Sequence, residues 1–192
     1  MTAGSGDERF PSSLSDLIER AGKQAPDRAV EGWNPDHSGT IDMRIDPAGN
    51  WFYNGSPIAR EALVRLFASI LRRDPDGRFV LVTPVEKLAM TVEDAPFAAV
   101  EMAAEGSGAN QVLNFRTNVG DIVTLDAEHR LRFDVENEHG GLKPYISVRG
   151  GLEALVTRAL TFDLIELAMA HDGADGLWSS GVFFPLPNGE GA

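Results

Sequence analysis

The chain has 192 residues and a net charge of −12, from 17 Lys and Arg against 29 Asp and Glu, and 43% of its residues are hydrophobic. So acidic a composition disfavours nucleic-acid binding, because it repels phosphate backbones. The absence of cysteine excludes disulfides, thiolate zinc sites and thiol nucleophiles. We find neither an apolar signal sequence nor a run of about 20 apolar residues, and therefore expect a cytoplasmic protein without a membrane span.

The first part of the chain predicts a helix and then a β-hairpin. Residues 1–11 are small and polar, which is typical of a mobile segment. The apolar residues that follow recur at helical spacing: Leu14, Leu17, Ile18 and Ala21. Apolar and polar residues alternate over 41–46, and the turn PAGN leads to WFY at 51–53, so these segments predict the two strands of a hairpin.

Two stretches predict long helices, and each contains the tetrapeptide EALV. In the first stretch Ser56 is placed to cap the helix, Pro57 suits the first helical position, and the apolar pattern runs to about Arg73. The second helix is expected from about Gly151 to His171 and is apolar over a wide arc. Strand-like segments separated by turns fill the region between the two helices, and one more strand closes the chain.

The repeated tetrapeptide suggests an internal duplication. A hairpin precedes and a strand follows EALV in both stretches, so that Asp46 corresponds to Asp126 and Glu61 to Glu153. The alternative is two ordinary amphipathic helices of common composition. The duplication predicts an α+β fold of two related modules, each with antiparallel strands packed on one long helix. The predicted parts are a mobile segment at 1–11, an N-terminal α+β domain at 12–83, a partly barrel-like C-terminal α+β domain at 84–187 and a tail at 188–192.

The starts of the two helices are the candidate binding site for a small anion. A helix N-terminus carries unpaired N–H groups and partial positive charge, which attract phosphate. Ser56 lies at the first start, and Tyr145, Arg149 and Gly150 precede the second. Gly150 would let a ligand approach the backbone, while Tyr145 would stack on a base and Arg149 would pair with a phosphate. The alternatives are a tight turn, a hydroxyl bonded to the backbone, and an ion pair of Arg149 with Glu153.

Further site residues are predicted at the junction of the two modules. Thr83, Glu86 and Lys87 lie there, and Lys87 would supply positive charge to a pocket between the domains. Asn118 precedes a turn and completes the predicted set. The alternatives are that Lys87 is a solvated strand residue paired with Glu86 or Asp94, and that Asn118 only adopts a turn conformation.

The sequence holds no strong catalytic or metal-binding constellation. The four histidines lack HxH, HxxxH and HExxH spacing, GSGAN lacks the lysine of a phosphate-binding loop, and WSSG is not a nucleophile elbow. We therefore predict no catalytic residue, metal or cofactor, and favour a protein that is not an enzyme. An enzyme of unknown class stays open as an alternative.

Several segments of the chain resemble the bacterial family called domain of unknown function 1285. These segments are residues 46–87, VEDAPF at 92–97, FRTN at 115–118, PYISVRGGLEAL at 144–155 and SSGVFFPL at 179–186. The resemblance runs from about Leu14 to Leu186 and is most specific from Trp51 to Lys87. It implies a duplicated α+β core, a second domain loosely like a pleckstrin-homology fold, a nucleotide-like ligand near the domain interface and a signalling role. It implies no established activity.

The sequence as a whole thus predicts a non-enzymatic ligand-binding or sensing protein. Its ligand would be a small anionic, nucleotide-like molecule bound between the domains, and its partner a signalling protein. The alternative from another class is an adaptor that binds protein through an exposed sheet edge or apolar patch, without a small ligand.

Overall fold

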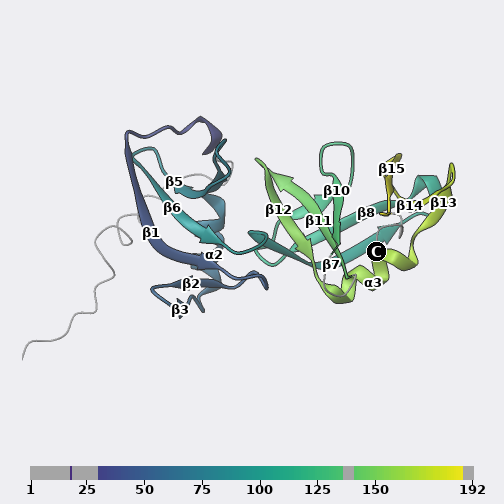
Figure 1. The fold of residues 1–192 in the computed structure, drawn as a ribbon, viewed down its shortest axis with the longest axis horizontal. Helices are drawn as coiled ribbons and strands as arrows, with labels where there is room; N and C mark the ends of the chain where they lie inside the picture. The colour runs from purple at the N-terminus through teal and green to yellow at the C-terminus, as the bar shows by residue number, and fades with distance from the viewer. Residues whose placement is uncertain (1–17, 19–29, 136–140, 188–192) are drawn as a thin grey trace, which may run out of the picture. The chain divides into compact units, whose positions relative to one another are not determined.

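The computed structural model describes residue 18 and residues 30–135 and 141–187 (Figure 1). The predicted mobile segment at 1–11, the predicted tail at 188–192 and, apart from Ile18, the predicted helix at 14–21 lie outside these residues. The chain divides into two compact units, Met1–Asp42 with Ile58–Met90 and Met43–Pro57 with Thr91–Ala192. The division falls within two strands, β1 (His37–Ile45) and β6 (Glu86–Val92), which each contribute residues to both units.

The first sheet has the strand order β3-β2-β1-β6-β5-β4. Its other strands are β2 (Trp51–Tyr53), β3 (Ser56–Pro57), β4 (Leu71–Arg73) and β5 (Phe79–Val82), and a short 3₁₀ turn, η1 (Val30–Gly32), precedes β1. The predicted hairpin is confirmed, because β1 and β2 pair antiparallel with Met43 opposite Tyr53. Asp46 caps its turn by accepting hydrogen bonds from the backbone N–H groups of Ala48 and Asn50, both at 2.9 Å.

Helix α2 (Glu61–Ser69) is shorter than the sequence predicted. It has nine residues and ends where Leu71 begins β4, so the segment to Arg73 that was predicted to be helical is a strand. Phe67 and Ala68 bury one side of the helix, and the apolar residues after it enter the sheet, where Leu71 pairs with Leu81. The core of the first unit therefore comes from strands as much as from the helix.

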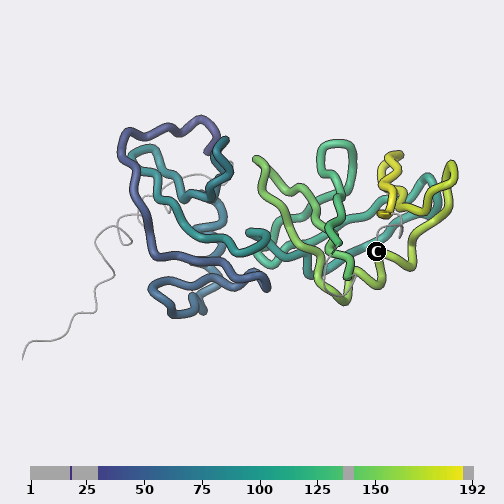
Figure 2. Tube along the Cα trace, viewed as in Figure 1, coloured from purple at the N-terminus to yellow at the C-terminus, as the bar shows by residue number. Residues whose placement is uncertain are grey.

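The second unit contains a six-stranded sheet of order β10-β11-β12-β7-β8-β9 and a three-stranded sheet of order β13-β14-β15 (Figure 1). The strands of the larger sheet are β7 (Phe97–Glu105), β8 (Val112–Thr117), β9 (Ile122–Thr124), β10 (Leu131–Val135), β11 (Leu142–Arg149) and β12 (Leu152–Val156). The remaining elements are η2 (Gly108–Asn110), α3 (Arg158–Glu166), β13 (Met169–His171), β14 (Ala174–Ser179) and β15 (Val182–Pro185). Figure 2 follows the chain through these strands in order.

One face of the larger sheet forms the core of the second unit. Residues on this core face alternate with more exposed ones along β8 and β12, as expected for a sheet that is buried on one side. Its buried side chains include Phe97, Phe115, Leu131, Ile146, Val148, Leu152, Ala154 and Val156. Helix α3 packs against β11 and β7, and its Leu164 is fully buried. The three-stranded sheet is tied on by Ser179, whose hydroxyl donates to the Leu125 carbonyl at 2.6 Å and accepts from the Leu113 N–H at 2.9 Å.

The predicted α+β fold with a long helix in each of two modules is wrong. The chain is mostly β, and the two α-helices of the described residues have nine residues each. The decisive finding concerns the repeated tetrapeptide: Glu61–Val64 opens α2, whereas Glu153–Val156 belongs to strand β12. The equivalence of the two EALV segments, on which the proposed duplication rested, therefore fails.

Strand β12 forms because LEALV also satisfies the period of a strand. Leu152, Ala154 and Val156 point to the core face, and β12 is hydrogen bonded to β11 on one side and to β7 on the other. Gly150 and Gly151 have φ values of 51° and 73°, which fits a two-residue hairpin turn with both central residues in the left-handed region. The predicted tight turn at these glycines is present, and it leads into a strand instead of a helix.

We predict that the turn at Gly150 tolerates asparagine and rejects valine. Gly150→Asn creates an Asn-Gly turn, which suits this geometry, and should change the free energy of unfolding by less than about 0.5 kcal/mol. Gly150→Val places a β-branched residue at positive φ and should cost about 1 to 2 kcal/mol. Urea denaturation followed by circular dichroism compares the two variants, and equal stabilities would contradict the turn assignment.

Candidate functional site

The residues predicted to form the site are distributed over both units. Thr83, Glu86 and Lys87 belong to the first unit, and Ser56, Asn118, Tyr145, Arg149 and Gly150 belong to the second. The helix starts on which the site was predicted are elsewhere, because α2 begins at Glu61 and α3 at Arg158. Ser56 pairs with Tyr53 in β3, and Gly150 lies in the β11–β12 turn. The helix-terminus argument is therefore wrong, and ligand binding by these residues stays a prediction.

Thr83 and Glu86 form the turn that joins β5 to β6. The Thr83 hydroxyl accepts from the backbone N–H of Glu86 at 3.2 Å, and the Thr83 N–H donates to the Glu86 carbonyl at 2.9 Å. Both residues are buried. A threonine hydroxyl that satisfies backbone groups in this way sets the geometry of a turn, which is a structural role.

Lys87 takes part in an ion-pair cluster of the first unit. Its Nζ lies 2.8 Å from Asp74 Oδ2, and Arg72 donates from Nε to Asp74 Oδ1, also at 2.8 Å. Arg72 further donates to the carbonyls of Val30 and Trp33. Burial acts to raise the pKa of Asp74, but the hydrogen bonds from Lys87 and Arg72 outweigh it and hold that pKa below its ordinary value. The positive charge predicted to serve a pocket is thus engaged by Asp74.

Tyr145 lies on the face of the larger sheet opposite the core face, which we call the charged face. The strand register places seven polar side chains on it, from β10, β11, β12 and the residue before β10: Arg130, Arg132, Asp134, Lys143, Tyr145, Ser147 and Glu153. The buried Tyr145 donates its hydroxyl to Asp94 Oδ1 at 2.7 Å, and Lys143 Nζ lies 3.3 Å from Asp94 Oδ2. Burial raises the pKa of Tyr145 well above its ordinary value, and the hydrogen bond to Asp94 raises it further.

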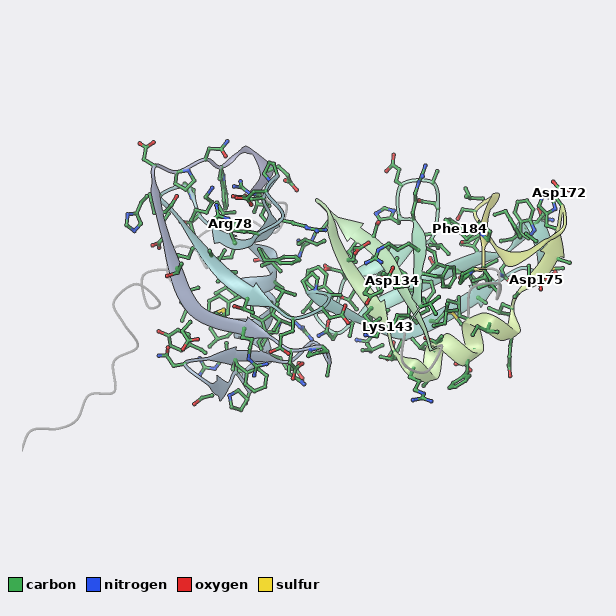
Figure 3. All side chains as sticks on the ribbon, in the orientation of Figure 1. Arg78, Asp134, Lys143, Asp172, Asp175 and Phe184 are labelled. Atoms are coloured by element: carbon green, nitrogen blue, oxygen red, sulfur yellow. The ribbon has the colours of Figure 1, made fainter. Side chains whose placement is uncertain are left out.

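Arg132 covers the Tyr145 ring. Its guanidinium lies 4.0 Å from the ring centroid, and it forms a two-point ion pair with Glu153 at 2.7 and 2.8 Å. A third hydrogen bond runs to Asp134 at 2.7 Å. Figure 3 labels Asp134 and Lys143, which face each other across β10 and β11. With its ring buried beneath a guanidinium, Tyr145 offers no open face on which a base could stack.

Arg149 is separated from Tyr145 by a β-bulge. The pairing of β11 with β12 shifts by one residue between Ser147 and Arg149, so that Arg149 lies opposite Leu152 on the core face. Its guanidinium lies 5.2 Å from the centroid of the Phe97 ring and 3.7 Å from Asp121 Oδ2. The structure therefore places the predicted base-stacking and phosphate-pairing residues on opposite faces of one sheet.

Asn118 connects two parts of the second unit. Its side chain accepts from the Ala98 N–H at 3.1 Å and donates to the Gly49 carbonyl at 3.1 Å, so it holds β7 to the turn of the β1–β2 hairpin. A methyl group on Gly49 would approach the Asn118 amide nitrogen to 2.8 Å. This close packing gives Asn118 a structural role besides the predicted turn conformation.

The predicted site included neither Arg130 nor Ser147, two neighbouring polar residues of the charged face. Arg130 is exposed and donates from Nε to the Ala127 carbonyl at 3.1 Å, and among the described residues its terminal amino groups have no acceptor. The Ser147 N–H donates to the Arg130 carbonyl, which places the two residues side by side on the charged face. The alternation in RLRFDV was a usable signal, because residues two apart in a strand share a face.

Two further findings concern metal sites and membrane-spanning helices. Across residues 30–135 and 141–187 no group of three or more His, Asp and Glu side chains is placed to hold a metal ion. In the same ranges no helix has the length and apolar character needed to cross a membrane.

Comparison with known proteins identifies relatives over most of the chain. The model described as "Domain of unknown function (DUF1285), N-terminal domain" matches residues 28–95, and that described as "Protein of unknown function (DUF1285), C-terminal domain" matches residues 96–186. A DUF1285 family protein from Silicibacter pomeroyi DSS-3 is 48% identical, with 88% of this chain and 93% of that chain covered and a TM-score of 0.82. A second, from Shewanella baltica OS155, is 26% identical over 66% of this chain and 91% of that chain, with a TM-score of 0.51. No curated protein matches.

We predict that Asp74→Asn destabilises the first unit. The change leaves Arg72 and Lys87 without their carboxylate and should lower the free energy of unfolding by about 2 to 3 kcal/mol at neutral pH. The lowered pKa of Asp74 means that the wild type loses this advantage as the pH falls below the ordinary value of 3.8, so the two curves should converge there. Asp76→Asn, at the exposed pair with Arg78 in the same hairpin, is the matched control and should change little.

We also predict that Tyr145 ionises only at unusually high pH. In a Tyr53→Phe variant Tyr145 is the single tyrosine, so absorbance at the tyrosinate band reports on it alone. The folded protein should titrate at higher pH than the same chain in urea, and its stability should fall as the pH rises above the ordinary pKa of 10.0, where the unfolded chain ionises first. Coincident titrations, with circular dichroism showing that the fold persists, would contradict the buried hydrogen bond to Asp94.

Proposed function

From the premise that the chain belongs to the DUF1285 family, we propose that it is a non-enzymatic ligand-binding protein for a small anionic molecule. The ligand class is phosphate-bearing and nucleotide-like, and its binding serves signal transduction, as the resemblance of the sequence implies. Arg130 and Ser147 on the charged face of the second unit donate hydrogen bonds to its phosphate.

This proposal rests on the N–H groups of Arg130 that have no acceptor among the described residues. A guanidinium has five N–H donors in a planar fork that matches two phosphate oxygens. Among the described residues, Arg130 donates only from Nε, to the Ala127 carbonyl, so its terminal amino groups have no acceptor there. The hydroxyl of the neighbouring Ser147 likewise has no hydrogen-bond partner among these residues. Two kinds of donor suited to phosphate thus lie next to each other on the charged face, the exposed Arg130 just before β10 and the half-buried Ser147 in β11.

The neighbouring charges favour Arg130 over the other cations of the charged face. Arg132 is neutralised by Glu153 and Asp134, and Lys143 is paired with Asp94. An anion that approached either one would have to displace a carboxylate, whereas Arg130 forms no ion pair with any residue that the structure describes. Because the chain is acidic overall, the attraction is local and should weaken as salt rises.

Two alternatives from the sequence, an adaptor without a small ligand and an enzyme of unknown class, stay predictions. The position of the ligand between the domains also stays a prediction. The proposed phosphate site does not require a ligand between the domains, because Arg130 and Ser147 both lie within the second unit.

We predict that Arg130→Gln weakens binding of phosphate-bearing ligands about tenfold, a loss of about 1.4 kcal/mol, which is the usual size for one charge-assisted hydrogen bond. Calorimetric titrations with inorganic phosphate and with nucleoside mono- and diphosphates, at low and at moderate salt, measure the effect.

Arg78→Gln provides the matched control, because it removes the same charge from an exposed arginine of the first unit. It should leave the affinity unchanged. The proposed site is wrong if no phosphate compound binds at millimolar concentration, or if the two variants weaken binding equally.

A further inference from the structure

Helix α3 has apolar side chains on two sides. Thr161 and Leu164 are buried on the side that packs against β11 and β7. Phe162 points away from that side and is 60% exposed, and Ile165, one turn after Thr161 at the edge of the buried side, is 40% exposed. Large apolar groups scattered singly on a surface are ordinary, but two that lie one turn apart on a short helix form a patch.

The patch is flanked by opposite charges at equal distances. Arg158 precedes Phe162 by four residues and Glu166 follows it by four, so all three side chains lie along one side of the helix. Both charged residues are exposed, and within the described part of the chain neither makes an ion pair. They are about 12 Å apart along the axis, too far to pair with each other.

We propose that this side of α3 binds the same side of α3 in a second copy of the chain, with the two helices antiparallel about a twofold axis at Phe162. In that arrangement Arg158 of each copy lies level with Glu166 of the other, and the two Phe162 rings meet at the axis. Ile165 lies level with the exposed Ala159 of the other copy along the axis, on the other flank of the contact. The proposal is independent of phosphate binding at Arg130.

The symmetry of the pattern selects a second copy over another partner. A twofold interface must be self-complementary, so each charge needs an opposite charge at the mirrored position along the helix. The α3 side meets this condition for the charged pair, Arg158 with Glu166, and for the central residue, Phe162. An unrelated partner would impose no such relation on the spacing.

The contact is small, and the association should be correspondingly weak. Nine helical residues span about 13 Å, so the helix pair alone falls at the lower end of specific interfaces. Met169, which is 47% exposed in β13 directly after the helix, extends the apolar surface. We therefore expect a dimer in equilibrium with monomer at micromolar concentrations.

Charge exchange tests the proposal. Sedimentation velocity over a range of concentrations should show the wild type dimerising, whereas Arg158→Glu and Glu166→Arg, each alone, place like charges opposite each other and should raise the dimer dissociation constant at least tenfold. The double variant should regain dimerisation. An equimolar mixture of the two single variants should form a heterodimer, because its two charged pairs are both complementary.

Glu61→Arg is the control, because it makes the same charge change at an exposed residue of α2, outside the patch, and it should leave dimerisation unchanged. Circular dichroism and thermal melts establish that every variant is folded. The proposal is overturned if the folded wild type stays monomeric up to about 500 μM, a concentration well above the dissociation constants of specific dimers. It is also overturned if Arg158→Glu and Glu166→Arg dimerise with the same dissociation constant as the wild type.

Discussion

Strand β12 is hydrogen bonded on both sides, antiparallel to β11 and parallel to β7, and the arrangement of the second unit depends on this central position. This position turns Leu152, Ala154 and Val156 to the core face. Because Arg149 is paired with Leu152, the chain must reverse within Gly150 and Gly151, and both of these residues have positive φ angles. The pairing of β12 with β11 also shifts by one residue before Arg149, and β12 ends at Val156, with Thr157 between it and the start of α3.

The electrostatics of the chain follow from how its few cations are used. In an acidic protein most arginine and lysine side chains of the described residues near the predicted site have a carboxylate within reach: Arg72 and Lys87 share Asp74, and Arg132 holds Glu153. Such groups contribute to structure and are poorly available to a ligand. Arg130 on the charged face and Arg158 on α3 differ, and they carry the two binding proposals through different chemistry, a phosphate fork and a pair of opposite charges.

Family membership was predicted from the residues and is confirmed over both halves of the chain. The α+β fold that the resemblance implied is wrong. The predicted site shows why residues chosen from local sequence need not lie together in the folded chain. Tyr145 and Arg149 are four residues apart and would share a face in a regular strand, but the bulge between them sends Arg149 to the core face.

The amino-acid sequence by itself determined the features that rest on local chemistry. Alternation marked β1, and turn residues on either side marked the segments of β6, β7 and β8. Asp46 and Asp126 cap their turns, Asp126 by accepting from the N–H groups of Glu128 and His129. Only the tertiary structure decided that one EALV is helical and the other extended. A short apolar segment fits both periods, so its conformation is decided by whether strands on either side offer their hydrogen bonds, and β11 and β7 do so only at Glu153–Val156.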